Sequence, residues 1–452
     1  MQARQSTLRL LKRVLISSLS VLLSTCTLAH TCSAQTRPTT VQARSTEYFL
    51  NTLGVNTHLN GLTASDPWDT DTARVGAQLK YLGVRLDRDW AWSVADGKTW
   101  KAVQTAWGPY GRFWTSIDEA SPATQRRNLG FEEAIYSAYP GLIYVMGGPN
   151  EEDNTYPQQQ GATLPDAAAV QQSLYTWAHS DNRSVPVSQM EFGAGWTAAN
   201  NWQGDYNPKN TGLNQNYTPG SADIGGAHTY LSNPQERPVD VLNHVRVLAG
   251  LTTPGKPVAH TEFGAYLGVH LSAESYGQFL VMGAFDSMAG GDTGYLVYGL
   301  QDSGPEQSYG FYTYPGNVPH AAAEDYHAMT AILASPRGSY GPGAARTFVP
   351  GSLAVTYTNT LTAAHLLMQK PTGEYVLADW SEQLMNGSEH PVSDTIHFGR
   401  AFGTVQVYNI EQGTTPLATL HGVSQYTLRM NPSDTYLLIL STKSTFSKGG
   451  IK

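Results

Sequence analysis

The chain has 452 residues, which is room for two or three domains, or for one barrel of about 250–300 residues with a smaller partner. Hydrophobic residues make up 40% and charged residues only 14%, so the chain can bury a large core, and wholesale disorder is excluded. There are 28 Lys and Arg against 36 Asp and Glu, a formal net charge of −8, which argues against nucleic-acid and anionic-membrane partners.

Residues 1–34 show the order of charge and hydropathy that is typical of a secretory signal peptide. Four cations precede an apolar stretch, Val14 to Leu28, and small residues at positions 32 and 34 precede a cleavage site. We therefore predict a secreted protein that is free of the membrane after cleavage; the alternatives are a retained anchor and a lipoprotein modified at Cys26. Both cysteines, Cys26 and Cys32, lie in this segment, which excludes thiol catalysis and Cys-ligated metals in the mature chain.

From about residue 45 to 335, short apolar runs typical of strands alternate with helical stretches. The expected strands are 53–58, 81–87, 112–117, 142–148, 185–190, 223–228, 257–261 and 294–299. The expected helices are 71–80, 128–139, 167–180, 239–251, 273–288 and 320–333. Strands that alternate with helices form a parallel sheet, and eight such units predict an α/β fold, the (β/α)8 TIM barrel, over 45–335.

A stretch rich in Gly and Pro, residues 336–346, ends this pattern. After it, strand-like runs rich in β-branched and aromatic residues recur every ten residues or so. They are 353–358, 363–369, 375–380, 395–398, 404–409, 424–430 and 435–440. This spacing predicts a C-terminal antiparallel β-sandwich over 345–442, followed by a tail at 443–452.

Polar residues stand where the predicted barrel strands end, which is where the active site of such a barrel lies. They are His58, Arg85 with Asp87, Asn150 with Glu151, His228 with Tyr230, and Glu262. Two carboxylates from separate strands suit acid/base and nucleophilic catalysis at a sugar carbon. One must be held protonated, and the other must stay ionised.

Four of these segments resemble motifs of glycoside hydrolase clan A, the retaining (β/α)8 glycosidases. Gly148–Glu151 reads Gly-Pro-Asn-Glu, similar to the motif of the fourth strand, and Thr261–Gly264 reads Thr-Glu-Phe-Gly, similar to the nucleophile motif of the seventh. His228–Tyr230 resembles the His-x-Tyr of the sixth strand, and Gly83–Arg85 resembles the arginine motif of the second. The added sandwich is similar to that of the heparanase-like and β-xylosidase-like members.

The resemblance implies a role for each matched residue. Glu151 would be the general acid/base, and Glu262 would be the nucleophile. Asn150 would bond the 2-hydroxyl of the sugar. Tyr230 and Arg85 would keep the Glu262 carboxylate ionised by hydrogen bond and charge.

His58, His228 and Tyr298 complete the predicted substrate-binding residues. Many members of the clan carry a tryptophan under the sugar on the eighth strand, and this chain offers Tyr298 instead, which leaves the platform of the −1 subsite open. Arg85 is alternatively a core ion-pair partner of a neighbouring aspartate, and either histidine is alternatively structural.

Two assignments have rivals in the sequence. Glu152 is adjacent to Glu151 and is the alternative acid. Glu191 begins a second Glu-Phe-Gly string and is the alternative to Glu262, but it precedes the His-x-Tyr motif, so the chain order favours Glu262.

We find no metal-binding or cofactor-binding motif: no His-x-x-x-His pair, calcium loop, phosphate loop or nucleophilic-serine elbow. No cofactor and no metal are therefore expected. The sequence predicts a secreted retaining β-glycoside hydrolase that acts on a poly- or oligosaccharide by double displacement. The rival prediction is a non-catalytic carbohydrate-binding protein on the same scaffold.

Overall fold

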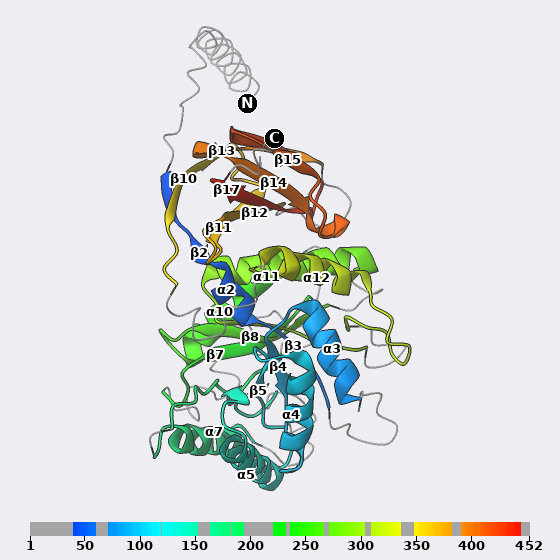
Figure 1. Ribbon diagram of the computed structural model, residues 1–452. Helices are drawn as coiled ribbons and strands as arrows, with labels where there is room; N and C mark the ends of the chain where they lie inside the picture. The colour runs from blue at the N-terminus through cyan, green and yellow to red at the C-terminus, as the bar shows by residue number, and fades with distance from the viewer. Residues whose placement is uncertain are drawn as a thin grey trace, which may run out of the picture. The chain divides into compact units, whose positions relative to one another are not determined.

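The computed structural model describes the chain from residue 39 to residue 443 with internal gaps (Figure 1). The described ranges are 39–59, 71–118, 120–151, 163–181, 183–193, 220–231, 236–265, 271–302, 309–335, 348–381 and 390–443. The predicted signal peptide and nearly all of the predicted tail lie outside them, so both stay predictions. Within these ranges no helix is both long and apolar enough to cross a membrane.

Seven strands in the described part of the chain form one sheet, in the order β6-β5-β4-β3-β9-β8-β7, with parallel pairing throughout. They are β3 (Leu53–Asn56), β4 (Leu86–Asp89), β5 (Arg112–Thr115), β6 (Ile143–Val145), β7 (Gly225–Tyr230), β8 (Val258–Gly264) and β9 (Gly294–Val297). The strand expected at 185–190 is present only as isolated parallel bridges, Met146 with Val187 and Ser188 with Ile224. These bridges lie next to the two edge strands, β6 and β7.

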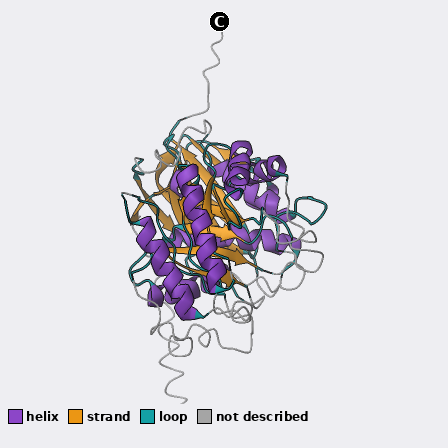
Figure 2. Cartoon of the chain, turned by 90° about the horizontal axis from the view of Figure 1, so that it is seen from below, coloured by secondary structure: helices purple, strands orange, loops and turns teal. Residues whose placement is uncertain are grey.

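Helices lie around the outside of this curled sheet (Figure 2). They are α2 (Thr46–Thr52), α3 (Thr72–Leu82), α4 (Asp96–Trp107), α5 (Pro122–Ala138), α7 (Leu164–Ala178), α10 (Pro238–Thr252), α11 (Ala273–Gly290) and α12 (Ala321–Leu333). The six predicted helices are confirmed with shifts at their ends, and α2 and α4 were not predicted. The alternation of strand and helix that the sequence predicts is therefore present.

Helix α3 shows how local chemistry sets the ends of these elements. The Asp71 side chain accepts hydrogen bonds from the backbone N–H groups of Ala73 and Arg74, which caps the first turn. Gly83 ends the helix with φ of 72°, a left-handed conformation that favours glycine. The prediction of a strand beginning at Tyr81 is wrong, because the last turn of α3 runs to Leu82 and β4 begins only at Leu86.

A small apolar cluster made by side chains of five neighbouring strands lies on one face of the parallel sheet. Its buried members are Leu86, Trp114, Val145, Ala259 and Leu296. Because side chains alternate along a strand, the face of β4 that carries Leu86 also carries Arg88, two residues nearer the carboxyl end. A much larger core lies between the strands and the helices.

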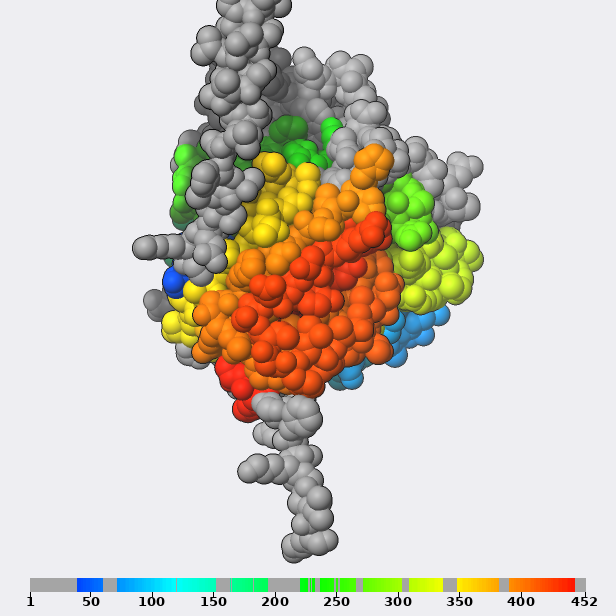
Figure 3. Space-filling view, turned by 90° about the horizontal axis from the view of Figure 1, so that it is seen from above, coloured from blue at the N-terminus to red at the C-terminus, as the bar shows by residue number. Residues whose placement is uncertain are grey.

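The remaining strands form what we call the two-sheet region, residues 39–45 and 352–441. Its later part, from residue 352 on, appears as a yellow-to-red surface in Figure 3. One sheet has the order β1-β10-β13-β16: β1 (Thr39–Gln42), β10 (Ser352–Tyr357), β13 (Val392–Phe402) and β16 (Val423–Met430). The other has the order β15-β14-β17-β12-β11-β2: β15 (Ala418–Leu420), β14 (Thr404–Asn409), β17 (Thr435–Ser441), β12 (Tyr375–Ser381), β11 (Ala363–Gln369) and β2 (Arg44–Ser45).

Both sheets contribute to one hydrophobic core, with Val355 and Leu428 from the first and Leu377 and Leu438 from the second. The strands expected at 363–369 and 404–409 are confirmed with the same bounds. Strands β1 and β2 were not predicted. They pair with β10 and β11, so the two sheets include residues that precede the expected start at 345.

Direct contacts join the two-sheet region to helices α11 and α12. The indole of Trp380 donates a hydrogen bond to Asp286 (3.2 Å) and stacks on Phe285 with ring centroids 5.6 Å apart. The ammonium group of Lys370 donates to the carbonyl oxygens of Ile332 (2.5 Å) and Ala334 (3.1 Å) at the end of α12. These buried polar contacts fix the orientation of the sheets on the helices.

Candidate active site

Glu151, His228 and Glu262 meet at the carboxyl ends of the parallel strands. His228 lies in β7 and Glu262 in β8, and Glu151 follows β6. The Nδ1 atom of His228 lies 2.6 Å from Oε1 of Glu151 and 3.3 Å from Oε2 of Glu262. One carboxylate oxygen of Glu151 lies within 4.8 Å of one of Glu262. The two glutamates selected from the sequence are thus brought together around one imidazole ring.

Both oxygens of Glu262 are held by donors. Nη1 of Arg88 donates to Oε1 (2.7 Å), and the hydroxyl of Tyr230 donates to Oε2. Burial raises the pKa of Glu262 above its ordinary value, and the nearby cations of His228 and Arg88 offset only part of this rise. Its side chain is 7% exposed, so an approaching sugar can reach it.

Arg88 is the centre of the polar network beneath the site. Its Nη1 atom also donates to Asn56, and its Nη2 atom donates to Ser116, Asn150 and Glu191. The amide nitrogen of Asn56 donates in turn to the backbone carbonyls of residues 261 and 297, which aims its oxygen at the guanidinium. Arg88 is fully buried, and its charge is matched by two carboxylates.

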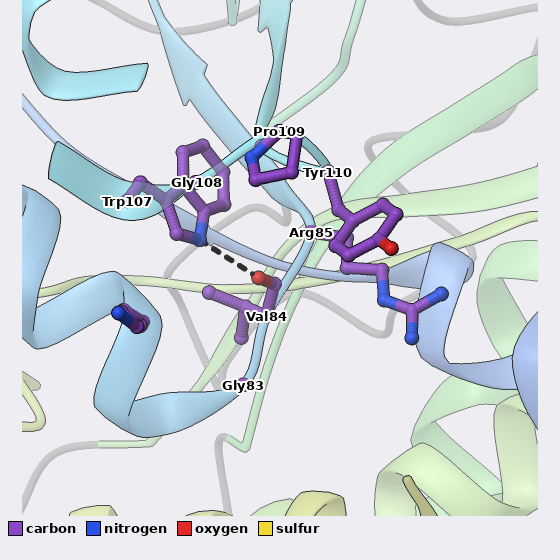
Figure 4. A pocket seen from close by; sticks show the side chains of 9 residues that line it. Gly83, Val84, Arg85, Trp107, Gly108, Pro109 and Tyr110 are labelled. Atoms are coloured by element: carbon purple, nitrogen blue, oxygen red, sulfur yellow. Dashed lines mark hydrogen bonds between the residues drawn. The ribbon is translucent and has the colours of Figure 1, made fainter. Parts of the chain in front are cut away.

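Arg85 does not take this role, so the prediction that it lies beside Glu262 is wrong. Arg85 precedes β4, at the opposite end of the strand from the site. Its guanidinium forms an ion pair with Glu47 (2.8 Å) and donates to Asn51 (2.9 Å). Figure 4 shows it beside Tyr110, in a pocket of about 250 Å³ where Trp107 donates to the backbone of residue 84. The alternative interpretation, a core ion pair, describes Arg85 better, with Glu47 as its partner.

Glu191 joins the same network as a third carboxylate. Its side chain is fully buried and lies 2.5 Å from Nη2 of Arg88 and 3.3 Å from Nε2 of His228. Burial alone would raise the pKa of Glu191, but Arg88 and His228 together bring it below its ordinary value. Glu191 is therefore ionised but enclosed, whereas Glu262 is the glutamate that a sugar can reach.

His228 is a cation between three carboxylates. Burial opposes its charge, yet Glu262, with hydrogen bonds to Glu151 and Glu191, raises the pKa of His228 to about 10. As an imidazolium it donates from Nδ1 to Glu151 and from Nε2 to Glu191. It therefore offsets much of the negative charge that three glutamates bring to a buried site.

The backbone around Glu151 is tightly constrained. Glu151 has φ of 43°, a region that is strained for a residue with a side chain, and its N–H donates to the carbonyl of Glu191 (2.8 Å). Gly193 faces the carboxyl group: a Cβ atom there would lie 3.1 Å from Cδ and 3.2 Å from Oε1 of Glu151. The backbone conformation of Glu151 and the absence of a side chain at Gly193 together fix the position of the Glu151 carboxyl group.

No family model matches the sequence, and no curated protein sequence matches it either. Solved structures do match. A glycoside hydrolase of family 39 from Bacteroides cellulosilyticus matches with a TM-score of 0.59 at 11% identity, over 88% of this chain and 82% of that one. A glucosidase from Croceicoccus marinus matches at 0.57 and 11%, over 90% and 98%. A family 30 endoxylanase from Clostridium papyrosolvens matches at 0.52 and 12%, over 89% and 98%.

The chain has the fold of the clan A glycosidases. The three alignments cover 88–90% of this chain, so the similarity extends over both the parallel sheet and the two-sheet region. The identities are too low to carry over any residue's role, so the roles rest on the geometry above.

Aromatic side chains line the site beside Glu262. The hydroxyl-bearing rings of Tyr230, Tyr298 and Tyr309 lie edge to face, with centroids 5.6–6.1 Å apart. His58 lies edge-on to Trp90 at 4.3 Å and to Tyr298 at 5.7 Å. Burial, with the nearby charge of Arg88, lowers the pKa of His58 to about 3, so this ring is neutral. Tyr298 thus lies next to Tyr230, which holds Glu262, and its contact with a sugar stays a prediction.

The Glu151, His228 and Glu262 side chains are also close enough for one metal ion to contact all three. A metal would replace the proton that His228 needs for its bonds to Glu151 and Glu191, and it would compete with Arg88 for Glu262. The charges of this cluster are already balanced by the two protein cations. The geometry therefore fits acid/base chemistry better than metal binding.

The structure brings six of the eight predicted residues around this cluster: Asn150, Glu151, His228, Tyr230, Glu262 and Tyr298. His58 lies edge-on to Tyr298, and its predicted contact with substrate stays a prediction, whereas Arg85 lies elsewhere. Sequence reasoning missed Arg88, and it named Glu191 as a rival nucleophile that could also line the cleft. The charged run Asp87-Arg88-Asp89, directly after the apolar Leu86, was the available indication of a buried polar centre. Glu152, the alternative acid, lies outside the described residues.

Replacing Gly193 with alanine is expected to impair the acid step without unfolding the protein. The added Cβ must displace the Glu151 carboxyl by a few tenths of an ångström, which we expect to lower kcat about tenfold for substrates with poor leaving groups. Substrates with activated aryl leaving groups need no proton, so they should be affected less. Gly130→Ala is the matched control, because a Cβ at Gly130 meets nothing within 4 Å. Equal losses on both substrate types would contradict the assignment of Glu151.

Proposed function

We propose that this chain is a secreted retaining β-glycoside hydrolase that cleaves O-glycosidic bonds of a poly- or oligosaccharide by double displacement. The observation that carries the proposal is the approach of the Glu151 and Glu262 carboxylates to within 4.8 Å. Inverting enzymes separate their carboxyl groups by about 6.5–9.5 Å to admit a water, whereas retaining enzymes need about 5–5.5 Å. The shared fold supports the same proposal: the described residues form a curled parallel sheet of seven strands and two further sheets, and we interpret these as a (β/α)8 barrel and a β-sandwich.

In the first step Glu262 attacks the anomeric carbon, and Glu151 gives its proton to the leaving oxygen. Arg88 and Tyr230 hold the two oxygens of Glu262, so the attacking carboxylate is fixed before the sugar binds. The oxygen of Asn150 is engaged by Arg88, which leaves its amide nitrogen to donate to the 2-hydroxyl of the sugar.

In the second step a water molecule attacks the glycosyl-enzyme, and Glu151 accepts the proton from that water. Formation of the covalent bond removes the negative charge of Glu262, which lies 3.3 Å from the His228 ring. His228 can then donate more strongly to Glu151, which stabilises the ionised form that acts as a base. The loss of negative charge at Glu262 and the gain of negative charge at Glu151 are therefore coupled through His228.

A substrate panel tests the proposal. Aryl β-xylosides and β-glucosides come first, since two of the similar structures are described as an endoxylanase and a glucosidase. Soluble xylans, β-glucans and mannans extend the panel. Proton NMR of the first-formed sugar should show a retained β-anomer. An initial α-anomer would refute retention, and binding of a glycan with no turnover on any member would favour the carbohydrate-binding alternative.

The pH dependence of kcat/KM is expected to be bell-shaped. Glu262 must be ionised to attack, and its raised pKa means that activity is lost on acidification at a higher pH than for an ordinary glutamate. Activity falls again at alkaline pH, once Glu151 has lost its proton. Tyr230→Phe removes a hydrogen bond that favours ionised Glu262, and it should move the acid limb upward by about one pH unit. If the acid limb does not move, the Tyr230 hydroxyl does not influence ionisation of the nucleophile, and the role given to it is wrong.

Secretion is the remaining part of the proposal, and it rests on residues 1–34 alone. Expression of the full chain with its leader in a Gram-negative host should release a mature protein that begins at Gln35. N-terminal sequencing of the exported protein reads this directly. If the protein is found in the membrane fraction with its leader still attached, the segment is a membrane anchor and the proposal of secretion is wrong.

A further inference from the structure

A second cluster of titratable side chains lies in the two-sheet region. It consists of His365 on β11, Asp379 on β12 and Asp394 on β13. The Nε2 atom of His365 lies 2.8 Å from Oδ2 of Asp394 and 3.6 Å from Oδ1 of Asp379. One ligand atom from each residue lies within 4.8 Å of the others, and both aspartates are fully buried. The cluster belongs to none of the chemistry described above.

Asp394 is held in place by the backbone. Its Oδ1 atom accepts hydrogen bonds from the N–H of Thr358 (2.8 Å), the hydroxyl of Thr358 (3.0 Å) and the N–H of Asn359 (2.7 Å). This leaves Oδ2 directed at His365. The His365 ring is in turn stacked on Tyr357 from β10, with centroids 3.7 Å apart. Two of the three groups are therefore fixed by their surroundings, as outer contacts fix the ligands of a metal site.

Asp379 is the group whose position needs an explanation. Its side chain is completely buried, and within the described ranges neither of its oxygens has a hydrogen-bond partner. It faces a second carboxylate, Asp394, and its Oδ1 atom lies 3.6 Å from Nε2 of His365. A buried carboxylate without donors is costly unless a cation or a proton compensates it.

We propose that His365, Asp379 and Asp394 form a binding site for a zinc ion. One imidazole nitrogen and two carboxylate oxygens suit zinc, whereas calcium and magnesium prefer ligand sets made of oxygen alone. Ligand atoms around tetrahedral zinc lie about 3.4 Å apart at bond lengths near 2.1 Å. The measured separations of 2.8 and 3.6 Å bracket that value. The ion would supply the positive charge that Asp379 lacks.

A zinc ion at this position would join the two sheets. His365 and Asp379 belong to the six-stranded sheet, and Asp394 belongs to the four-stranded sheet. An ion that binds only the folded arrangement stabilises it. The effect expected is on stability, and hydrolysis at the Glu151 site is not expected to need the metal. The inference is therefore independent of the proposed function.

The test uses the mature protein after dialysis against a chelator, with ZnCl2 at pH 7 as the probe. Calorimetry should show one zinc ion bound per chain, and zinc at about 100 times Kd should raise the melting temperature by about 3 °C. Asp379→Asn should abolish both effects. The variant keeps the shape of the side chain and removes one of two facing charges, so we expect the metal-free variant to fold. His365→Gln is the second variant, and His397→Gln, at an exposed position on β13, is the matched control.

Three results would overturn the inference. Absence of stoichiometric zinc binding by the wild-type chain would mean that the two carboxyl groups share a proton only. Equal zinc binding by wild-type and Asp379→Asn protein would place the metal elsewhere. Zinc that inhibits hydrolysis and still binds to Asp379→Asn protein would place it at the Glu151 cluster. Absence of hydrolysis in the wild-type protein, together with zinc binding that Asp379→Asn abolishes, would concern the proposed function and leave the zinc site standing.

Discussion

Replacing Glu262 with alanine is expected to lower kcat by about 10⁴-fold or more, because the double displacement loses its nucleophile. Added azide should restore part of the turnover. The small anion fits the space left by the carboxylate and attacks the anomeric carbon, so the product should be a glycosyl azide of inverted configuration. Product analysis by NMR in the presence and absence of azide makes the measurement.

Glu191→Ala is the variant for comparison with Glu262→Ala, because each of the two glutamates begins a Glu-Phe-Gly string. Glu191 is enclosed behind Arg88 and His228, so its loss disturbs the charges of the site but opens no path for azide to the sugar. We therefore expect reduced activity without azide rescue. Rescue of Glu191→Ala with an inverted product, and none of Glu262→Ala, would exchange the two assignments.

The second large effect is expected on kcat when Arg88 is replaced with lysine, with Arg85→Lys as the matched control. Arg88 uses both terminal guanidinium nitrogens, Nη1 and Nη2, to hold Glu262, Asn150 and Glu191, and an ammonium group cannot reproduce that planar arrangement. Arg88→Lys should lower kcat by about 10²–10³-fold while the protein stays folded. Arg85→Lys should leave kcat and KM near the wild-type values, because its partners Glu47 and Asn51 lie away from the site.

Circular dichroism and thermal melting separate these effects from misfolding. Complete removal of the charge, as in Arg88→Met, leaves Glu191 and Glu262 buried without their cation and should cost about 3–5 kcal/mol of stability. If Arg85→Lys lost as much activity as Arg88→Lys, the sequence-based role of Arg85 would return. If neither variant lost activity, the network beneath Glu262 would have no part in catalysis.

The site residues could be found from the sequence because polar residues interrupt apolar strands at their carboxyl ends. This pattern located Glu151, His228 and Glu262, whose positions depend only on the parallel sheet. It failed at Arg85 because the prediction assigned Tyr81 and Leu82, the last two residues of helix α3, to the strand that follows. That error ended the strand two residues early and put the wrong arginine at its end.

Alternation along the strand separates the two arginines once the correct bounds are known. Leu86 and Arg88 share the inner face of β4, and Arg85 is neither in the strand nor in register with them. The network made by Glu191 could not be predicted, because it depends on the pairing of residues 187–191 with both β6 and β7 through isolated bridges. Such pairing leaves no periodic pattern in the sequence.

The strands that precede the parallel sheet were missed for a different reason. β1 has four residues, three of them exposed, and β2 has only two, so neither gives an alternating apolar pattern. Their partners, β10 and β11, lie about 300 positions later in the chain. Local propensity carries no information about a partner at that distance, so the expected boundary at 345 described only the later strands of the two sheets.

The pairing of β1 with β10 constrains the order in which the chain can fold. Gln42 and Ser352 form a hydrogen bond across 310 positions of sequence, so β1 cannot pair until β10 has been synthesised. Contacts of such long range slow folding, since a large loop must close before they form. Until then the open edges of β10 and β11 are exposed to pairing with other chains. If the chain is exported from its amino end, as we propose, the same delay occurs on the far side of the membrane, and assembly of the two sheets is completed there.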